Sequence, residues 1–364
     1  MATRTVIKLG SSTVAEPTGH PRVDVIARIA TAVAARRAAG EDVVVVSSGA
    51  IAHGMQVMGR TGRSSVIEDL QAASAVGQGK LFRVWDEQLA AEGVRSAQVL
   101  LTFFDLMART HYLNARATLE RLLAWGVVPV INENDTTTTD EISFGDNDFL
   151  AAQVAVLVGA DRLILLTDID GLYTADPRLD PDAQLVREVH DFEGLSRLDI
   201  GHSTSPLGSG GMRSKVVAAE MASAAGIVTV VANGVRPGAL DAVLAGAEEG
   251  TRFAPAEARH SSFKLWLKYA KPARGTIVVD AGAAKALKTG GTSLLPVGIT
   301  DVRGEFDAGD AVHVAQGAVV IGKGISSYTA GELRQVVGLQ SPRVREVLPR
   351  ASDEAVHRDY FVLA

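Results

Sequence analysis

The sequence predicts an α/β protein with a mostly parallel sheet sandwiched by helices, followed by a small β-rich barrel. Short runs of β-branched residues alternate with helix-like segments through the first 250 residues, which is the pattern of right-handed βαβ units. Beyond Gly250 the runs become shorter and are separated by Gly and Asp turns, as in small barrels. A chain of 364 residues also exceeds the usual size of one domain. We therefore expect two domains.

Six segments are expected to form the strands of the first domain. Val43 to Val46 are all apolar, as a strand buried on both faces requires. Helical periodicity predicts a helix from Val23 that stops at Gly40, and another over 108–126. The expected strands are 4–9, 42–48, 95–101, 127–132, 162–168 and 227–233.

The domain boundaries follow from the change in composition. Residues 1–255 form the α/β domain, 256–272 a linker that ends at Pro272, and 273–364 the β-rich domain. Four segments of the last domain, 275–287, 293–299, 301–315 and 317–328, are expected to supply its short strands.

Composition excludes several classes of function. A net charge of -6 is too mild to indicate nucleic acid or acidic membranes as partners. Without cysteine the chain has no disulfide, no thiolate metal site and no Cys nucleophile. No apolar run is long enough to span a membrane, and the N-terminal run is too short for a signal peptide. We expect a cytoplasmic protein without a membrane partner.

Small and polar residues follow four of the predicted strands. Ligands of open parallel sheets bind beyond the carboxyl ends of the strands, so these segments are expected to meet at one site. Together with the Gly-rich loop 206–213, which precedes a helix expected to begin near Ser214 and Lys215, they indicate a nucleotide-phosphate site. The four segments contain Lys8 and Gly10, Ser48 and Gly49, the acidic stretch 130–148, and Thr167 with Asp168.

Other familiar sites do not occur. The chain has no Walker A loop and no GxGxxG fingerprint. It has no HExxH zinc motif and no GxSxG nucleophile elbow. Each polar loop alone is weak evidence, because any of them serves equally well as a plain connection or a helix cap.

Five motifs in a fixed order resemble those of the glutamate 5-kinases in the amino-acid kinase family. They are VIKLGSS, VVVVSSGAIAHG, VVPVINENDTTTTDEISFGDND, LLTDIDGLYTADPR and GSGGMRSK. The tail, with VDAGAAKAL, TSLLPVGI and GEFDAGD, looks like a PUA module. The resemblance covers nearly the whole chain and implies the amino-acid kinase fold.

The resemblance also implies a phosphotransferase with a carboxyl group as acceptor. ATP would phosphorylate the γ-carboxylate of L-glutamate to give L-glutamyl 5-phosphate, the first step of proline biosynthesis. It further implies Mg²⁺ as cofactor, carried mainly by the ATP phosphates with no protein metal ligand. Proline is the expected feedback inhibitor, and a homodimer or homotetramer the expected assembly.

Carried over position by position, the resemblance assigns roles to individual residues. Lys8, Lys215 and Asp148 would be catalytic, with Asp148 in an electrostatic role because glutamate is already ionised near neutral pH. The substrate would be bound by Ser48, Gly49, Asn132, Asn134, Asp135, Asp146 and Asn147. ATP would be bound by Lys8, Gly10, Thr167, Asp168, Ser209, Gly210, Gly211, Met212, Arg213, Ser214 and Lys215.

The acidic stretch 130–148 divides under this interpretation. Its ends, INEND and GDND, would form the walls of the glutamate site, because amides and carboxylates suit a zwitterion. Its middle, which contains Thr136–Thr139, would be a polar excursion with solvated Asp140 and Glu141.

Two alternatives stay open at this point. A different kinase of the family would act on acetylglutamate, aspartate, carbamate or uridylate, although INEND together with GDND favours glutamate. A regulatory RNA-binding protein on an inactive kinase scaffold is the second, and the presence of both Lys8 and Lys215 argues against it. From Lys271 onward 11 Lys and Arg face 10 Asp and Glu, so the tail lacks the basic surface that RNA binding needs.

Overall fold

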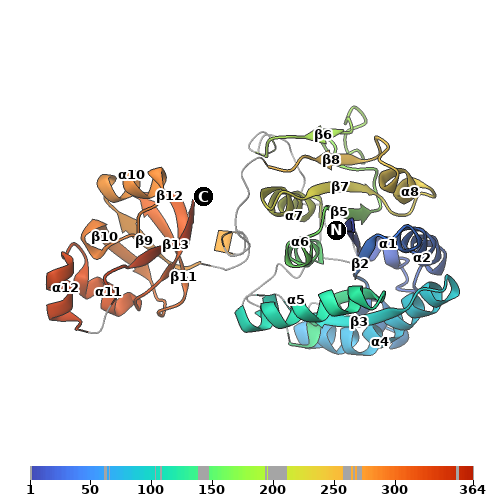
Figure 1. The fold of residues 1–364 in the computed structure, drawn as a ribbon, viewed down its shortest axis with the longest axis horizontal. Helices are drawn as coiled ribbons and strands as arrows, with labels where there is room; N and C mark the ends of the chain where they lie inside the picture. Colours follow the sequence, from blue (N-terminus) through green and yellow to red (C-terminus); the bar gives the residue numbers. More distant parts are fainter. Residues whose placement is uncertain are drawn as a thin grey trace. The chain divides into compact units, whose positions relative to one another are not determined.

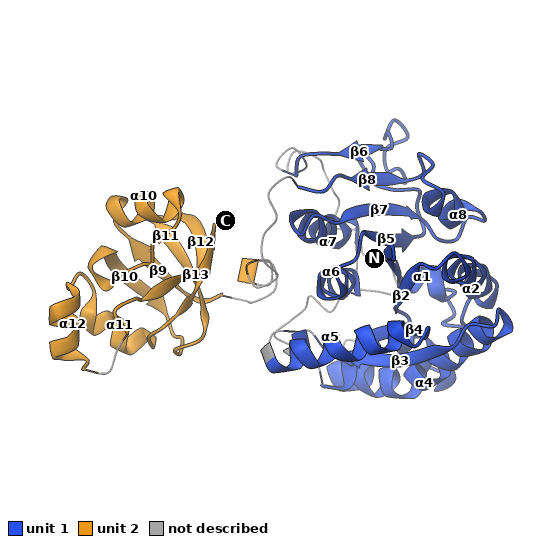
Figure 2. Ribbon diagram, viewed as in Figure 1, with its two compact units in different colours: residues 1–259 blue, residues 260–364 orange. Residues whose placement is uncertain are grey.

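The fold was analysed in a computed structural model of the chain, which divides into two compact units, Met1–Arg259 and His260–Ala364 (Figure 2). Most of the predicted linker 256–272 and part of the acidic stretch lie outside the described residues. The structure describes residues 2–60, 64, 66–102, 104–106, 109–137, 147–192, 195, 211–256, 264, 267–268, 273–349 and 352–363.

The first unit is built on an eight-stranded sheet with the order β3-β4-β2-β1-β5-β7-β8-β6. Neighbouring strands from β3 to β7 are parallel, whereas β8 runs antiparallel to β7. The six predicted strands are confirmed, each within one residue of the expected bounds. The strands are β1 (Arg4–Leu9), β2 (Asp42–Ser47), β3 (Ser96–Leu101), β4 (Val128–Glu133), β5 (Arg162–Thr167), β6 (Glu188–Val189), β7 (Val228–Asn233) and β8 (Thr251–Phe253).

Helices cover both faces of this sheet (Figure 1). One face packs against α2, α4 and α8, and the other against α5, α6 and α7. In Figure 1, α6 and α7 lie on one side of β5 and β7, while α2 and α8 lie on the other. The helices are α1 (Ser11–Val14), α2 (Val23–Ala38), α3 (Ala50–Val57), α4 (Ile67–Ala91), α5 (Arg109–Ala124), α6 (Asn147–Val158), α7 (Met212–Ala224) and α8 (Ala239–Leu244), with 3₁₀ turns at Phe104–Leu106 and Asp135–Thr137.

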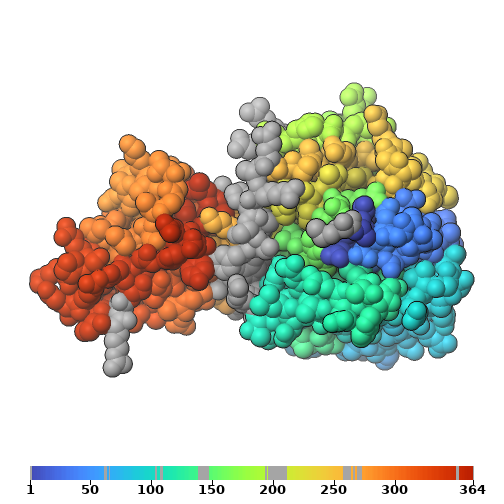
Figure 3. All heavy atoms as spheres, viewed as in Figure 1, coloured from blue at the N-terminus to red at the C-terminus, as the bar shows by residue number. Residues whose placement is uncertain are grey.

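Sequence pattern explains which helices are buried and which are exposed. Helix α6 is apolar on nearly all sides and lies against β1, β5 and α7, so it belongs to the core. Helix α5 carries an apolar stripe that includes Leu119 and Leu123, and its outer side forms part of the molecular surface, in teal in Figure 3. Trp125, directly after α5, is 63% exposed.

Helices α3 and α4 cross at unusually close range through two glycines. A Cβ atom on Gly54 would lie 1.7 Å from the carbonyl oxygen of Ala73. One on Gly77 would lie 2.0 Å from the carbonyl oxygen of Ala50. Real Cβ atoms do not approach backbone oxygens this closely, so only glycine permits the crossing. The crossing fixes the position of α4 relative to the end of β2.

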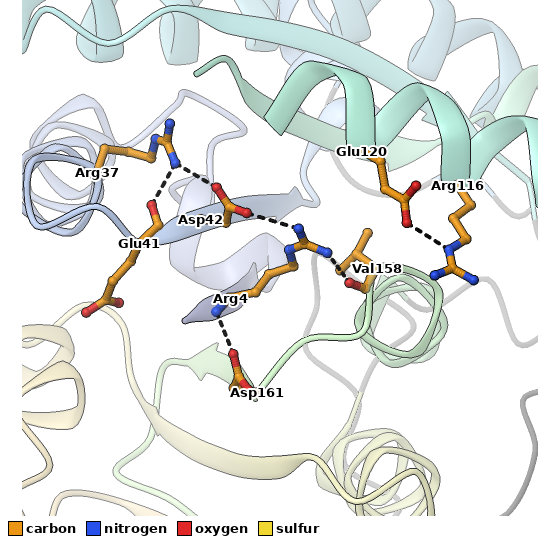
Figure 4. Close-up of polar contacts among 8 residues, drawn as sticks. All are labelled: Arg4, Arg37, Glu41, Asp42, Arg116, Glu120, Val158 and Asp161. Atoms are coloured by element: carbon orange, nitrogen blue, oxygen red, sulfur yellow. Dashed lines mark hydrogen bonds and ion pairs between the residues drawn. The ribbon is translucent and has the colours of Figure 1, made fainter. Parts of the chain in front are cut away.

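An ion-pair network ties the amino ends of the central strands together (Figure 4). Asp42 accepts from Arg4 at 3.0 Å and from Arg37 at 2.9 Å. The Arg4 backbone N–H donates to Asp161 at 2.7 Å, and its guanidinium donates to the Val158 carbonyl. Because these contacts join β1, β2 and the turn before β5, we assign them to stability.

The second unit contains a five-stranded sheet with the order β10-β9-β11-β12-β13. Strands β9 and β11 are parallel, and the other neighbouring pairs are antiparallel. Its strands are β9 (Ala273–Val279), β10 (Ile299–Gly304), β11 (Ala311–Gln316), β12 (Val319–Ser326) and β13 (Val356–Leu363), and its helices α10 (Ala281–Thr289), α11 (Ala330–Val336) and α12 (Ser341–Val347), with a 3₁₀ turn at Pro296–Gly298.

Strands were predicted throughout 275–287, and for the second half of this segment the prediction is wrong. Ala281–Thr289 is helix α10, because it is rich in the strong helix formers Ala, Leu and Lys. Asp280 caps the helix, since its side chain accepts the Ala283 N–H at 2.7 Å. Residues 293–299 likewise contain the 3₁₀ turn Pro296–Gly298 before β10 begins.

In the part of the chain that the structure describes, no helix combines the length and the apolar character needed to cross a bilayer.

The glycine crossing leads to a stability prediction. Gly77→Ala places a methyl group against backbone that cannot rotate away, so α3 and α4 must separate, at a cost of about 1–3 kcal/mol. Gly79→Ala on the same helix is the control, because Gly79 is exposed with open space around its Cβ position. It should gain about 0.5–1 kcal/mol from helix propensity. Chemical denaturation of both variants measures the difference, and equal stability would contradict the assigned crossing.

Candidate active site

The carboxyl ends of the parallel strands meet at one edge of the sheet, with β1 at the centre between β2 and β5. Gly10, directly after β1, donates its N–H to the Leu166 carbonyl on β5 at 3.2 Å. Ser48, directly after β2, donates its N–H to the Leu9 carbonyl on β1 at 3.1 Å. These backbone bonds bring the polar residues that follow β1, β2 and β5 together.

Two lysines and one aspartate form a buried cluster at this edge. Lys8 Nζ lies 2.5 Å from Asp148 Oδ1, and Lys215 Nζ lies 3.0 Å from Asp148 Oδ2. Lys8 is 2% exposed, Lys215 5% and Asp148 0%. The three side chains come from β1, α6 and α7, so the cluster exists only in the folded chain.

The two ammonium groups keep Asp148 ionised. Burial by itself would raise the pKa of Asp148, but the ammonium groups of Lys215 and Lys8 outweigh it and hold that pKa well below its usual range. Asp148 is therefore ionised at neutral pH. Two buried ammonium groups thus lie at the same point of this edge.

The N-terminus of α7 completes the surroundings of Asp148. Helix α7 begins at Met212, slightly before the predicted start near Ser214, with Gly211 in extended conformation as its N-cap. Ser214 Oγ lies 2.9 Å from Asp148 Oδ2 and 2.8 Å from the Gly211 carbonyl oxygen. This first turn places both Ser214 and Lys215 against Asp148.

Asn147, the neighbour of Asp148 on α6, belongs to a second polar cluster. Its Nδ2 donates to Ser48 Oγ at 2.9 Å and to Asn132 Oδ1 at 3.1 Å. Ser48 and Asn132 are buried, and Ser48 is followed by Gly49, whose φ of +102° makes it a left-handed N-cap of α3. The first turn of α6 thus joins the lysine cluster to an amide and hydroxyl cluster.

Helix α4 contributes two further polar side chains to this corner. Gln78 Oε1 accepts from Asn132 Nδ2 at 2.9 Å, and Ser74 Oγ donates to Asp135 Oδ2 at 2.7 Å. Asn134 lies close by, with its Oδ1 accepting from Thr136 Oγ1 at 2.5 Å. The end of β4 and the turn after it are therefore held against α4.

A cavity of about 250 Å³ opens beside this corner. Its wall includes the buried carboxylate side chain of Glu133 as well as Asp135, and it is closed on the sheet side by Gln98 and Leu100 of β3. Among the described residues, the lining consists of Ser74, Ala75, Gln78, Gly79, Gln98, Leu100, Glu133, Asn134, Asp135 and Thr136.

Other predicted ATP-binding residues occupy the same edge of the sheet. Thr167 is buried at the end of β5, with its Oγ1 donating to Asp168 Oδ1 at 3.2 Å and its carbonyl accepting from Gly234 N at 2.8 Å. Gly10 lies beside the Lys8 ammonium group, since a Cβ at its position would be 3.9 Å from Lys8 Nζ. Arg213 is exposed on the first turn of α7.

The structure groups seven of the predicted site residues into these two clusters. Lys8, Asp148, Ser214 and Lys215 form the first, and Ser48, Asn132 and Asn147 the second. Predicted residues Asp146, Ser209 and Gly210 lie outside the described residues, as do Thr138 and Thr139. Sequence analysis missed Ser74 and Gln78, which lie inside a helix. The run of small residues around Gly77 was their one sequence signal, because it marks a close helix contact.

The Asp148 cluster predicts an acid-dependent loss of stability. Its carboxyl has a folded-state pKa depressed below the ordinary value of about 3.9, so it stabilises the fold fully above that pH. As pH falls further, the unfolded chain takes up the proton first and the stabilisation is lost. Asp148→Asn should lower the free energy of unfolding by about 3–5 kcal/mol at pH 7, because two buried lysines lose their partner.

Denaturation of wild type and Asp148→Asn at pH 7 and at pH 3 measures this effect. The difference in the free energy of unfolding between wild type and Asp148→Asn should be smaller at pH 3 than at pH 7. A difference in the free energy of unfolding that is the same at both pH values would contradict the depressed pKa of Asp148.

Comparison with known proteins agrees with this geometry. The model of the amino acid kinase family matches residues 3–233, and that of the PUA domain matches residues 275–348. Glutamate 5-kinase of Meiothermus ruber is 48% identical over 364 residues, covering 99% of this chain and 96% of that protein. The glutamate 5-kinases of Ralstonia nicotianae and Myxococcus xanthus are each 46% identical, covering 100% and 98% of this chain and 97% and 95% of their own. The chain belongs to the amino acid kinase family, and within it to the glutamate 5-kinases.

Proposed function

We propose that the protein transfers the γ-phosphoryl group of ATP to the γ-carboxylate of L-glutamate, giving L-glutamyl 5-phosphate and ADP. The observation that carries this proposal is the placement of two clusters on one helix turn. Asp148 holds Lys8 and Lys215, while the preceding residue Asn147 contacts Ser48. A site for transferring phosphate thus adjoins a site for binding a small polar acceptor.

Phosphoryl transfer to a carboxylate brings two anions together. The charge on the transferring oxygens must be neutralised, and positioning with electrostatics supplies most of the catalysis. Lys8 and Lys215 approach Asp148 through its two different oxygens, so their ammonium groups can contact a phosphoryl group from two sides. Their burial strengthens each interaction, because the local dielectric is low.

Asp148 acts in this proposal by placing the lysines and not by accepting a proton. Its pKa lies far below neutrality, so it is a poor base, and the acceptor carboxylate needs none. Ser214 adds a hydrogen bond that fixes one carboxylate oxygen.

The second cluster and the adjoining cavity suit a small zwitterion. Carboxylates such as Glu133 and Asp135 favour an ammonium group, while hydroxyl and amide groups such as Ser48 favour a carboxylate. A volume of about 250 Å³ has the scale of an amino acid and not of a large polymer segment.

We infer that Mg²⁺ enters with ATP, bound to its phosphates. The residues fit this arrangement, because the carboxylate beside the two lysines is already engaged by both ammonium groups. Mg²⁺ would supply further neutralisation of the phosphoryl oxygens.

The remaining parts of the proposal rest on family membership. They are feedback inhibition by proline, assembly as a homo-oligomer and reaction in the cytoplasm. RNA binding is not part of it, since acidic and basic residues are balanced in the tail.

The activity is tested with ATP, Mg²⁺, glutamate and hydroxylamine. We expect formation of γ-glutamyl hydroxamate with an equal amount of ADP, because hydroxylamine traps an acyl phosphate. Acetylglutamate, aspartate, carbamate and UMP serve as alternative acceptors. ADP release with one of these, and none with glutamate, would overturn the substrate assignment.

Replacement of one lysine tests the phosphate role. Lys8→Met should lower kcat by about 10²- to 10³-fold, because a buried cation that faces the transferring group is lost. Lys285→Met, an exposed position on α10, is the matched control and should keep wild-type kcat. A Lys8→Met variant that folds and turns over at the wild-type rate would exclude Lys8 from the transfer.

Proline inhibition is tested by titrating proline into the same assay. Inhibition that weakens as glutamate is raised is the expected result. Full activity at high proline would remove inhibition from the proposal.

A further inference from the structure

A chain of side-chain amides connects helix α4 to the proposed acceptor site. It runs from Gln78 through Asn132 to Asn147, and ends on Ser48. Gln78, Asn132 and Ser48 are 8%, 6% and 7% exposed, so solvent does not substitute for these bonds. We refer to these four residues as the amide relay.

The direction of every bond in the amide relay is fixed by one backbone group. The Glu133 backbone N–H donates to Asn132 Oδ1 at 2.9 Å, and a backbone N–H can only donate. Asn132 must therefore present its oxygen to β4 and to Asn147, and its Nδ2 to Gln78. The orientation of the Asn132 amide follows from this donor and not from a choice between two equivalent fits.

The orientation of the Asn132 amide in turn determines the orientation of the Asn147 amide, because Asn132 Oδ1 must face the Nδ2 of Asn147. Both protons of Asn147 Nδ2 are used, one by Asn132 Oδ1 and one by Ser48 Oγ. Asn147 Oδ1 has no hydrogen-bond partner among the residues that the structure describes. Toward a ligand, Asn147 can therefore act only as an acceptor.

Ser48 acts toward a ligand as a hydrogen-bond donor, in contrast to Asn147. Its Oγ already accepts a hydrogen bond from Asn147, so the hydroxyl proton is the group it can offer to a ligand. An acceptor at Asn147 and a donor at Ser48 match an ammonium group and a carboxylate of one small molecule.

We propose that Gln78 is a positioning residue for glutamate: it anchors the Asn132 amide, whose orientation the Glu133 N–H sets, and thereby holds Asn147 and Ser48 in place as acceptor and donor. Its Oε1 holds the Asn132 amide, and the close crossing of α3 and α4 at Gly77 places Gln78 at that distance. This inference rests on the proposed function and adds a residue that neither the strand-end motifs nor the two clusters identify.

The test compares two replacements of Gln78. Gln78→Met keeps the length of the side chain but removes the acceptor, so the Asn132 amide keeps its bond to the Glu133 N–H but loses its second anchor and can tilt away from Asn147. We expect the KM for glutamate to rise about five- to tenfold, as for one lost hydrogen bond, with the KM for ATP within twofold of wild type. Gln78→Glu retains an acceptor at the same position and should recover most of the glutamate KM.

Gln88→Met, further along α4, is the matched control and should leave both KM values unchanged. Thermal unfolding of each variant separates loss of the fold from loss of positioning. If Gln78→Met does not fold, Gln78→Asn, which withdraws the acceptor by one methylene, carries the same expectation.

The possible outcomes decide separate questions. Wild-type protein without glutamate-dependent ADP formation overturns the proposed function. Active wild type, with the KM for glutamate unchanged in Gln78→Met or raised equally with the KM for ATP, overturns the positioning role alone. A selective rise that Gln78→Glu reverses supports it.

Discussion

The arrangement of the first unit depends on one buried carboxylate held between two ammonium groups. Asp148 draws Lys8 from β1 and Lys215 from α7 to the same point, although the three residues are far apart in sequence. This carboxylate offsets part of the free-energy cost of burying the two lysines, because desolvation of an ammonium group is costly unless an anion lies close by. The same contact brings two cations to one point, so the stability of the unit and its proposed phosphate role depend on the same residues.

The amino ends of the strands carry contacts that stabilise the fold, and the carboxyl ends carry the candidate site. At the amino ends, Asp42 is matched by Arg4 and Arg37, and the charges are largely satisfied within the protein. At the carboxyl ends, Asp148 lies against Lys8 and Lys215, and its neighbour Asn147 lies against Ser48 and Asn132. Helix α6 connects the two functions, since its first turn carries both residues while its apolar body is anchored between β1, β5 and α7.

Much of this architecture could be predicted from sequence, for a physical reason. Parallel strands buried on both faces need nearly continuous apolar runs, so Val43 to Val46 identify β2 without ambiguity. Lys8 followed from its position at a strand end, and Lys215 and Asp148 from motif resemblance, but the convergence of these three on one point is a property of distance in space. Gln78 was not predicted as a site residue, because no sequence pattern distinguishes a functional polar residue inside a helix from a solvated one. The helix at Ala281–Thr289 was misassigned because its apolar residues outweighed the capping Asp280.

The glycine crossing between α3 and α4 has a consequence for redesign of the acceptor pocket. Because backbone meets backbone at Gly54 and Gly77, the two helices behave as one rigid wall, and no change of side chain can thicken or thin it there. A pocket for a longer or bulkier acid would have to be carved from the opposite side, at Gln98 and Leu100 on β3. Strand β3 is at the edge of the eight-stranded sheet and pairs with β4 on one side, so a shift of its backbone breaks fewer hydrogen bonds than a shift of a central strand. The pocket can therefore be widened at its β3 wall, while its α4 wall stays where the crossing with α3 holds it.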